Sequence, residues 1–327
     1  MRRALAIALA LIVPIALVAS ACGSDDGADV RSAGGASASG SGSGSGSAAG
    51  SGTGISLEDT ATVGTDNAQV LAAVAAYKTY VKAKTDDIVA TTRTFTDAVR
   101  AGDVAAAKAA YAPSRESWEA IEPIAGLIPS IDGAIDSRVD DFAGVNDPKF
   151  TGWHRLEYLL WEKNTTTGGA TYADQLDAGL AKLKTGIATL DIPPLAMAQG
   201  ASELIQEVSE GKITGEEDRY SKTDLWDFAA NVAGSERIIT ELTPALEKAD
   251  PALLKKIQAD FKELNASIDT LRKGDGFVLF CQENDDFPNA ALCPSTTVTQ
   301  AQIDTLKGQL AGLSEDLALV PGALGLK

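Results

Sequence analysis

The chain contains a single histidine, and it stands three residues before a glutamate. On a helix, His154 and Glu157 project to the same side. Phe150 and Trp161 fall on the same stripe, so the rest of this face is apolar. Burying an imidazole and a carboxylate without partners costs several kcal/mol. The pair therefore indicates either a bound metal ion or a hydrogen-bonded histidine in the core.

Two further carboxylates, Glu119 and Glu122, are again three residues apart. Carboxylates on one helical turn repel each other unless a cation or an arginine joins them. Asp136, followed closely by Asp140 and Asp141, lies on the next short segment and could close over the same spot. The alternative interpretation is a solvated acidic helix face.

A third candidate set lies in the acidic segment 215–227, GEEDRYSKTDLWD. Glu217 is the candidate ligand here, and the choice among Glu216, Glu217 and Asp218 stays open. Thr214 and Glu217 also match a capping box, which gives Glu217 a structural alternative.

The residue types narrow the chemistry. Carboxylates with one imidazole suit iron, manganese, calcium or magnesium better than copper(I) or structural zinc. With a single histidine the metalloprotease motif His-Glu-x-x-His cannot be completed. The sequence offers neither a Ser/His/Asp candidate nor a glycine-rich phosphate loop. These patterns favour a metal-binding protein over an enzyme.

Helices must position these residues. Apolar residues recur at three, four and seven positions through residues 67–100, which is the period of an amphipathic helix. Similar patterns, caps and prolines predict further helices at 103–124, 131–140, from 147 past 161, 172–190, 195–211, 223–248, 250–273 and 299–319. No alternating run is long enough to predict a sheet. The expected fold class is all-α, with two antiparallel helical bundles packed in one domain.

Prolines sharpen several of these boundaries. Asp147-Pro148 and Asp250-Pro251 each place a capping residue before a proline at the first helical position. Pro113 and Pro244 fall inside expected helices, where proline should kink or divide them.

The first residues read as an export signal. Arg2 and Arg3 precede an uncharged stretch, Ala4 to Val18, that is shorter than the roughly 20 residues a membrane span needs. We expect residues 1–21 to be a signal peptide. Small residues lead into Cys22, which resembles a lipobox, so Cys22 is the expected lipidation site; plain cleavage after Ala21 is the alternative.

Two regions of different composition follow the expected cleavage site. Residues 22–60 are dominated by Ser, Gly and Ala and predict a flexible tether. Residues 61–327 form the expected helical domain. The net charge is −17, and loss of Arg2 and Arg3 makes it more negative by two. Nucleic acid is therefore a poor partner.

Two cysteines remain in the expected domain. Cys281 and Cys293 bracket a short loop, and in an oxidising compartment they predict a disulfide. A free thiol or a thiolate metal ligand is the alternative.

Three segments in order resemble one known family. The string 147–157, DPKFTGWHRLE, resembles the Gly-x-His-x-x-Glu signature of imelysin-like proteins. Segment 212–228 is similar to the EfeO-type branch of that family, as is 111–115 leading into Glu119 and Glu122. The resemblance covers residues 66–324, and it implies a double helical bundle that binds iron.

The resemblance also implies a site, partners and a location. The metal ligands would be Glu119, Glu122, Asp136 and Glu217, with His154 and Glu157 as a second or adjoining set. The ion would be Fe²⁺ or Fe³⁺, with other divalent cations possible, and it would be delivered to an Efe-type iron permease that works with a haem peroxidase. The chain would sit on the outer face of the cell membrane, held by its lipid anchor only.

Two other functions stay open. Imelysin-like proteins have been grouped with peptidases, so a metallopeptidase is one alternative. An envelope polysaccharide-binding lipoprotein is the other, since Trp118, Trp153, Trp161 and Trp226 could stack on sugars, although tryptophans at this spacing are more often core residues. Some family members carry a copper-binding cupredoxin domain where this chain has its Ser/Gly tether.

Overall fold

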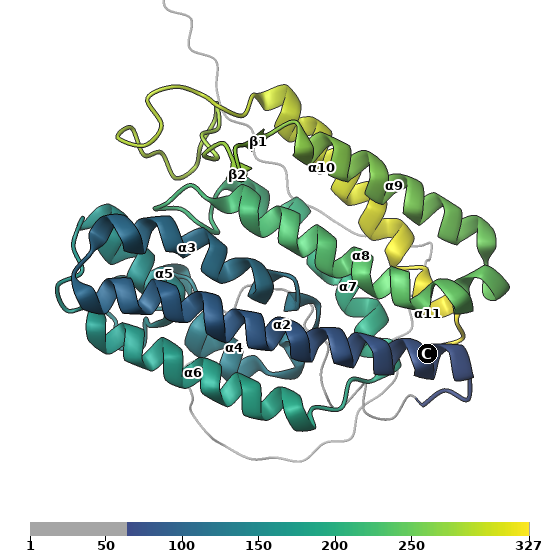
Figure 1. Ribbon diagram of the computed structural model, residues 1–327. Helices are drawn as coiled ribbons and strands as arrows, with labels where there is room; N and C mark the ends of the chain where they lie inside the picture. Colours follow the sequence, from purple (N-terminus) through teal and green to yellow (C-terminus); the bar gives the residue numbers. More distant parts are fainter. Residues whose placement is uncertain (1–63, 327) are drawn as a thin grey trace, which may run out of the picture. The chain divides into compact units, whose positions relative to one another are not determined.

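The computed structural model describes residues 64–326, and the domain is built almost entirely from helices (Figure 1). The predicted signal peptide (1–21), Cys22 and the tether (22–60) lie outside the described residues. Those three assignments therefore stay predictions.

The first bundle contains α2 (Ala68–Ala101), α3 (Val104–Glu119) and α6 (Gly169–Thr189), with the short helices α4 (Pro129–Ile135) and α5 (Gly152–Glu157) packed beside them. α2 buries one stripe of side chains that includes Val70, Tyr77 and Phe95. Asn67 caps this helix, and Gly102, at φ 79°, ends it. The period-based prediction for this helix is therefore confirmed.

The second bundle contains α7 (Pro194–Glu210), α8 (Asp224–Ala249), α9 (Pro251–Asp269) and α10 (Gln300–Leu317), followed by α11 (Val320–Ala323). Asp250 caps α9 as expected, and Thr299 caps α10. Figure 1 shows α7 and α8 between the first bundle and the α9–α10 pair. The all-α fold with two packed bundles is thus confirmed.

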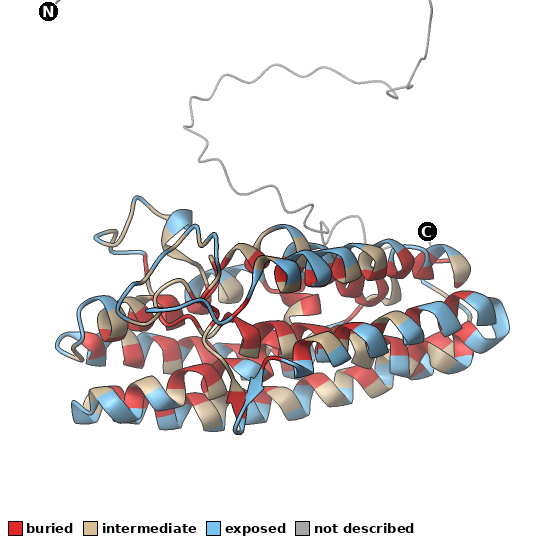
Figure 2. Cartoon of the chain, turned by 90° about the horizontal axis from the view of Figure 1, so that it is seen from above, coloured by how far each residue is buried: buried red, intermediate tan, exposed pale blue. Residues whose placement is uncertain are grey.

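The two bundles meet where α8 packs against α2 and α3, and where α7 packs against the 3-10 helix η1 (Glu122–Leu127). Buried residues line the inner faces of the helices and exposed residues cover the outer faces (Figure 2). α3 and α8 therefore each turn one side toward the seam between the bundles.

Several predicted boundaries are wrong. Asp147-Pro148 does not start a helix; Asp147 instead accepts hydrogen bonds from the amides of Ala143 and Lys149 in a turn. The helix starts at Gly152 and continues as the π-helix η3 (Tyr158–Glu162). The expected 131–140 helix is split into α4 and the 3-10 helix η2 (Val139–Asp141).

Of the two outcomes expected at the interior prolines, division of the helix does not occur, and one helix ends earlier than expected. α3 runs through Pro113 and α8 through Pro244 without being divided. The expected 250–273 helix ends at Asp269, where a small antiparallel hairpin follows, β1 (Arg272–Lys273) and β2 (Gly276–Phe277). Tertiary packing around a helix can outweigh the local preference of a proline.

Candidate metal centre

The six predicted ligands converge at the seam between the bundles. Glu119 ends α3, Glu122 starts η1, Asp136 follows α4, His154 and Glu157 lie on α5, and Glu217 lies in the turn after the 3-10 helix η4 (Lys212–Thr214). Five of them are no more than 8% exposed, and Glu122 is partly exposed. The alternative of a solvated acidic face is therefore wrong for Glu119.

Two close glycine contacts bring these elements together. Gly152 has φ 80°, and a Cβ there would lie 2.1 Å from the carbonyl oxygen of Ile135. This contact sets the start of α5, with His154, beside Asp136. On α8, a Cβ at Gly234 would lie 2.3 Å from the carbonyl oxygen of Ala120. Glycine at these two positions therefore lets the backbones approach closely enough to form the site.

Arg115 occupies the centre of the cluster and is fully buried. Its guanidinium donates to Glu119 (2.5 Å), one helical turn later, and to Glu217 (2.7 Å). It also donates to Asp136 and, at 3.2 Å, to Asp227 on α8. Burial opposes its charge, but Asp136, Asp227 and Glu119 raise the pKa of Arg115 well above its usual value. Arg115 is therefore the permanent counterion of this site.

Lys212 is the cation that joins Glu119 and Glu122, which would otherwise repel each other. Its Nζ lies 3.0 Å from Oε2 of Glu119, 2.7 and 2.9 Å from the two oxygens of Glu122, and 3.6 Å from Oε1 of Glu217. The Asn231 amide also donates to Glu119 (2.9 Å) and Glu122 (2.7 Å). Burial opposes ionisation of Glu119, but Lys212 and Arg115 outweigh it and lower the pKa of Glu119.

His154 carries the feature that points most directly to a ligand. Its Nδ1 lies 3.2 Å from Glu157 Oε2 and 3.4 Å from the hydroxyl of Tyr111. Its Nε2 is buried and makes no hydrogen bond within residues 64–326, yet it lies 3.6 Å from Asp136 Oδ1 and 3.7 Å from Glu217 Oε1. This nitrogen faces two carboxylates at a separation that an ion could bridge.

Protonation of His154 reflects the same surroundings. Burial and the charge of Arg115 both lower its pKa. Hydrogen bonding to Glu157 and the charges of the nearby carboxylates raise it by a larger amount. The net result is that the pKa of His154 rises to about 9. The imidazole is therefore protonated at neutral pH in the metal-free protein, and a metal ion has to displace that proton.

Glu157 is held by the turn that also carries Glu217. Its Oε1 accepts hydrogen bonds from the amides of Tyr220 (2.9 Å) and Ser221 (2.7 Å). The turn segment and α5 thus fix each other. The predicted capping box is wrong, because Glu217 does not cap a helix and instead binds Arg115 and Arg138.

Three overlapping groups have ligand atoms within 4.8 Å of one another, and all their members are buried. They are Asp136, His154 and Glu217; His154, Glu157 and Asp218; and Glu119, Glu217 and Asp227. Within the described chain Glu122 belongs to none of them, and its carboxylate is bound to Lys212. Glu217 belongs to two groups, which favours it as the ligand of the acidic segment.

Carboxyl groups outnumber cations in this interior. The buried acids are Glu119, Asp136, Glu157, Glu217, Asp218, Asp224 and Asp227. The buried basic side chains are Arg115, Lys212 and Lys222, and Lys222 is paired with Asp285. Burial raises the pKa of Asp218 to about 6 and raises those of Asp224 and Asp227 well above their usual value. Buried excess negative charge is costly unless protons or a bound cation neutralise it.

The sequence prediction missed part of the site. Lys212, Tyr111 and Asn231 contact predicted ligands, and Asp227 binds Arg115 and has a carboxylate oxygen within 4.8 Å of ligand atoms of Glu119 and Glu217. Only spatial neighbourhood shows these contacts. A usable signal was present on α8, where Asp224, Asp227 and Asn231 fall on one helical face. Asp140, by contrast, lies outside the cluster and pairs with Arg219 at the surface.

A disulfide loop braces the turn that carries Glu217. Cys281 and Cys293 are bonded, with an S–S distance of 2.01 Å. Within this loop, Asp285 pairs with the buried Lys222 at 2.9 Å, and Gln282 donates to the carbonyl of Ile213 at 3.2 Å. The loop therefore holds both ends of segment 213–222.

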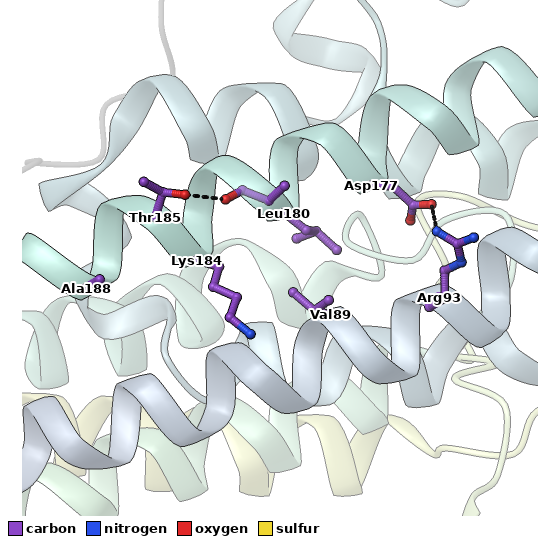
Figure 3. Close-up of a pocket in the computed structure, with 8 residues that line it drawn as sticks. Val89, Arg93, Asp177, Leu180, Lys184, Thr185 and Ala188 are labelled. Atoms are coloured by element: carbon purple, nitrogen blue, oxygen red, sulfur yellow. Dashed lines mark hydrogen bonds and ion pairs between the residues drawn. The ribbon is translucent and has the colours of Figure 1, made fainter.

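Other surface features lie apart from the cluster. A groove of about 740 Å³ runs between α2 and α6, with Val89 and Leu180 in it and the Arg93–Asp177 pair at one end (Figure 3). It contains none of the predicted ligands. Trp118 and Trp153 are fully buried, so they are core residues and cannot stack on a sugar. Within residues 64–326, no helix is both long and apolar enough to cross a membrane.

The chain is similar in sequence to proteins of one known family. Residues 73–317 match the imelysin family, whose designation is peptidase M75. The iron uptake system component EfeO of Escherichia coli O1:K1 is 48% identical over 255 residues, and those of E. coli K12 and Shigella flexneri are 47% identical. Each alignment covers 78% of this chain but 64% of the relative, so the chain matches less than two thirds of their length.

A solved structure shows the same fold. An imelysin-like protein from Psychrobacter arcticum 273-4 superposes with a TM-score of 0.58 over 81% of this chain and 98% of that protein, at 10% identity. The resemblance inferred from the three sequence segments is confirmed, and the chain belongs to the imelysin family.

Proposed function

We propose that this chain is the iron-binding component of an extracytoplasmic iron-uptake system, which captures Fe²⁺ or Fe³⁺ and passes it to a membrane permease. The observation that carries the proposal is the buried His154 Nε2, which lacks a hydrogen bond within the described residues and faces Asp136 and Glu217. A cation there neutralises part of the surrounding carboxylate excess.

The ligand set follows from this position. Asp136, His154 and Glu217 bind the ion directly, and the other three predicted ligands, Glu119, Glu122 and Glu157, lie around them. Oxygen ligands with one imidazole suit iron, and manganese or another divalent cation can replace it. Arg115 donates to Asp136 Oδ1 and Glu217 Oε1, the same two oxygens that face His154, so it orients these carboxylates and the ion shares them with its guanidinium.

The relatives support the biological setting. EfeO proteins are components of iron uptake systems, and this chain is 47–48% identical to them over the aligned part. An Efe-type permease and a haem peroxidase are the proposed partners. Lipidation at Cys22 places the chain on the outer face of the cell membrane, where an iron-uptake component acts.

Anaerobic titration with Fe²⁺ tests the site. His154→Gln combined with Asp136→Asn should weaken iron binding at least about tenfold, because two ligands are lost. Asp316→Asn is a matched control, since Asp316 is also 8% exposed and ion-paired but lies on α10, where it pairs with Lys256. Equal iron affinity in the double variant and the control would remove these residues from the site.

The family's peptidase designation supports one alternative, a metallopeptidase. Its catalytic ion would be held by the same ligands. Incubation with unfolded protein substrates, with and without a chelator, separates the two functions. Reproducible cleavage that a chelator abolishes and His154→Gln removes would replace iron binding as the main activity.

A further inference from the structure

Three cations hold the carboxylates of the metal centre in the absence of an ion, and they differ in how firmly they are fixed. Arg115 is fully buried and contacts carboxylates from four separate segments. Arg138 lies at the outer edge and is partly exposed. Lys212 is buried, but its partner Glu122 reaches the surface, with a side chain that is 12% exposed.

Lys212 occupies a position that resembles a cation site. Four carboxylate oxygens surround its Nζ, three of them at 2.7 to 3.0 Å. A divalent ion needs such oxygens at about 2.0–2.6 Å, so a small inward movement of the same carboxylates would suit it. The neighbouring Asn231 has an Oδ1 that is buried and makes no hydrogen bond within the described residues, and an amide flip would turn it toward this space.

An ion bound between the glutamates would occupy the position that the ammonium now fills. Two positive charges a few ångströms apart repel strongly in a buried site. Lys212 also shares Glu217 with the position beside His154, because its Nζ and His154 Nε2 lie 3.6 and 3.7 Å from the same oxygen, Oε1. An ion bound beside His154 therefore competes with Lys212 for Glu217 even without entering the space between the glutamates.

We propose that Lys212 competes with the bound iron for the carboxylates of the metal centre; this inference rests on the proposed function. In the metal-free protein its ammonium binds Glu119 and Glu122. The ion binds when the lysine leaves them, and the lysine returns when the ion is released. The long flexible lysine stem permits this movement, whereas the fork of Arg115 is fixed by its partners. Glu207, an exposed carboxylate near the end of α7 whose charge acts on Lys212, offers the displaced ammonium a new partner.

The competitor role and a purely structural role predict opposite changes in ion affinity when Lys212 is removed. If Lys212 only supports the fold, its removal weakens ion binding or leaves it unchanged. If it competes, its removal strengthens binding. We expect Lys212→Met in the full chain to bind Mn²⁺ at least about tenfold more tightly than the wild type in calorimetric titration. Its release of Mn²⁺ to excess chelator should be slower by a similar factor.

Two variants control for charge and burial. Lys212→Arg keeps a positive charge among the glutamates and should not gain affinity. Lys222→Met removes another fully buried lysine, whose ammonium pairs with Asp285 outside the cluster, and should not gain affinity either. Equal or weaker Mn²⁺ binding by Lys212→Met, or tighter binding by all three variants, would overturn the proposal.

Further measurements distinguish a folding defect of Lys212→Met, and a failure of the proposed function, from a failure of the competitor role. Should Lys212→Met fail to fold without metal, Mn²⁺ should restore its helical circular dichroism, since the ion replaces the missing ammonium. No recovery at saturating Mn²⁺ would overturn the competitor role. A wild type that binds neither iron nor Mn²⁺ contradicts the proposed function, whereas a wild type that binds iron, with unchanged affinity in Lys212→Met, overturns only the present inference.

Discussion

The outer pair α9 and α10 and the seam pair α3 and α8 are all helices with one buried face, but these faces differ in chemistry. α9 buries only apolar side chains, such as Ile257, Phe261 and Leu264, and α10 nearly so. α3 and α8 bury Arg115, Glu119, Asp224, Asp227 and Asn231 among their apolar residues.

The difference separates stability from function within one fold. An apolar helix face stabilises by removing surface from water and makes no demand on a ligand. A buried charged face has a desolvation cost, and paired charges recover it only when every partner is present. The seam therefore carries groups that a cation can rearrange, while the outer pair holds the second bundle together.

The largest effect should come from removing the central guanidinium. Arg115→Met leaves several buried carboxylates without their counterion and should lower the free energy of unfolding by about 3–5 kcal/mol. Phe261→Ala on α9 should cost a similar amount, about 3–5 kcal/mol, by creating a cavity. Urea unfolding measures both.

Added Mn²⁺ should distinguish these two variants. The ion binds the carboxylates that Arg115 no longer neutralises, so it should restore much of the stability of Arg115→Met by mass action. Phe261→Ala should gain no more from Mn²⁺ than the wild type does. An equal gain in both variants would show that the seam and the outer pair do not differ in this respect.

The disulfide loop should give the next largest effect. Replacing Cys281 and Cys293 by serine releases a loop with a sequence separation of 12 and should cost about 3 kcal/mol of stability. The loss should also weaken iron binding, because the loop braces the turn that carries Glu217. Calorimetry on the oxidised wild type and the serine variant checks this; reduced stability with unchanged iron affinity would confine the loop to a structural role.

The smallest effect is a dependence on pH. Because the pKa of His154 is about 9, Mn²⁺ has to displace a proton at neutral pH. Affinity should therefore rise about tenfold per pH unit from 7 to 9, which is about 1.4 kcal/mol per unit, and then level off. In the metal-free protein, the stability due to protonated His154 is complete below pH 6.5 and is lost as the pH rises through 9.

His154→Gln should flatten the affinity profile between pH 7 and 9, and titrations at matched ionic strength measure it. The outer pair supplies the contrast, since Asp316→Asn on α10 should keep the wild-type slope. A wild-type affinity that does not change across this range would argue against His154 as a ligand.

Much of the fold could be predicted because a helix is recognisable from its own local sequence. The apolar period predicted α2 to within one residue at each end, and Asp250-Pro251 predicted the start of α9, although not its end. Asp147-Pro148 and the Thr214/Glu217 pair gave wrong starts, because a matching local motif does not say which partner its side chain finally binds.

The sequence by itself determined the helices, the family and the short list of acidic residues with one histidine. Only the tertiary structure decided that Arg115 lies among those acids and that Lys212 fills the space between Glu119 and Glu122. The physical reason is that helical period is a local property of the chain. The pairing of buried charges depends on how two bundles pack, and residues about a hundred positions apart meet only there.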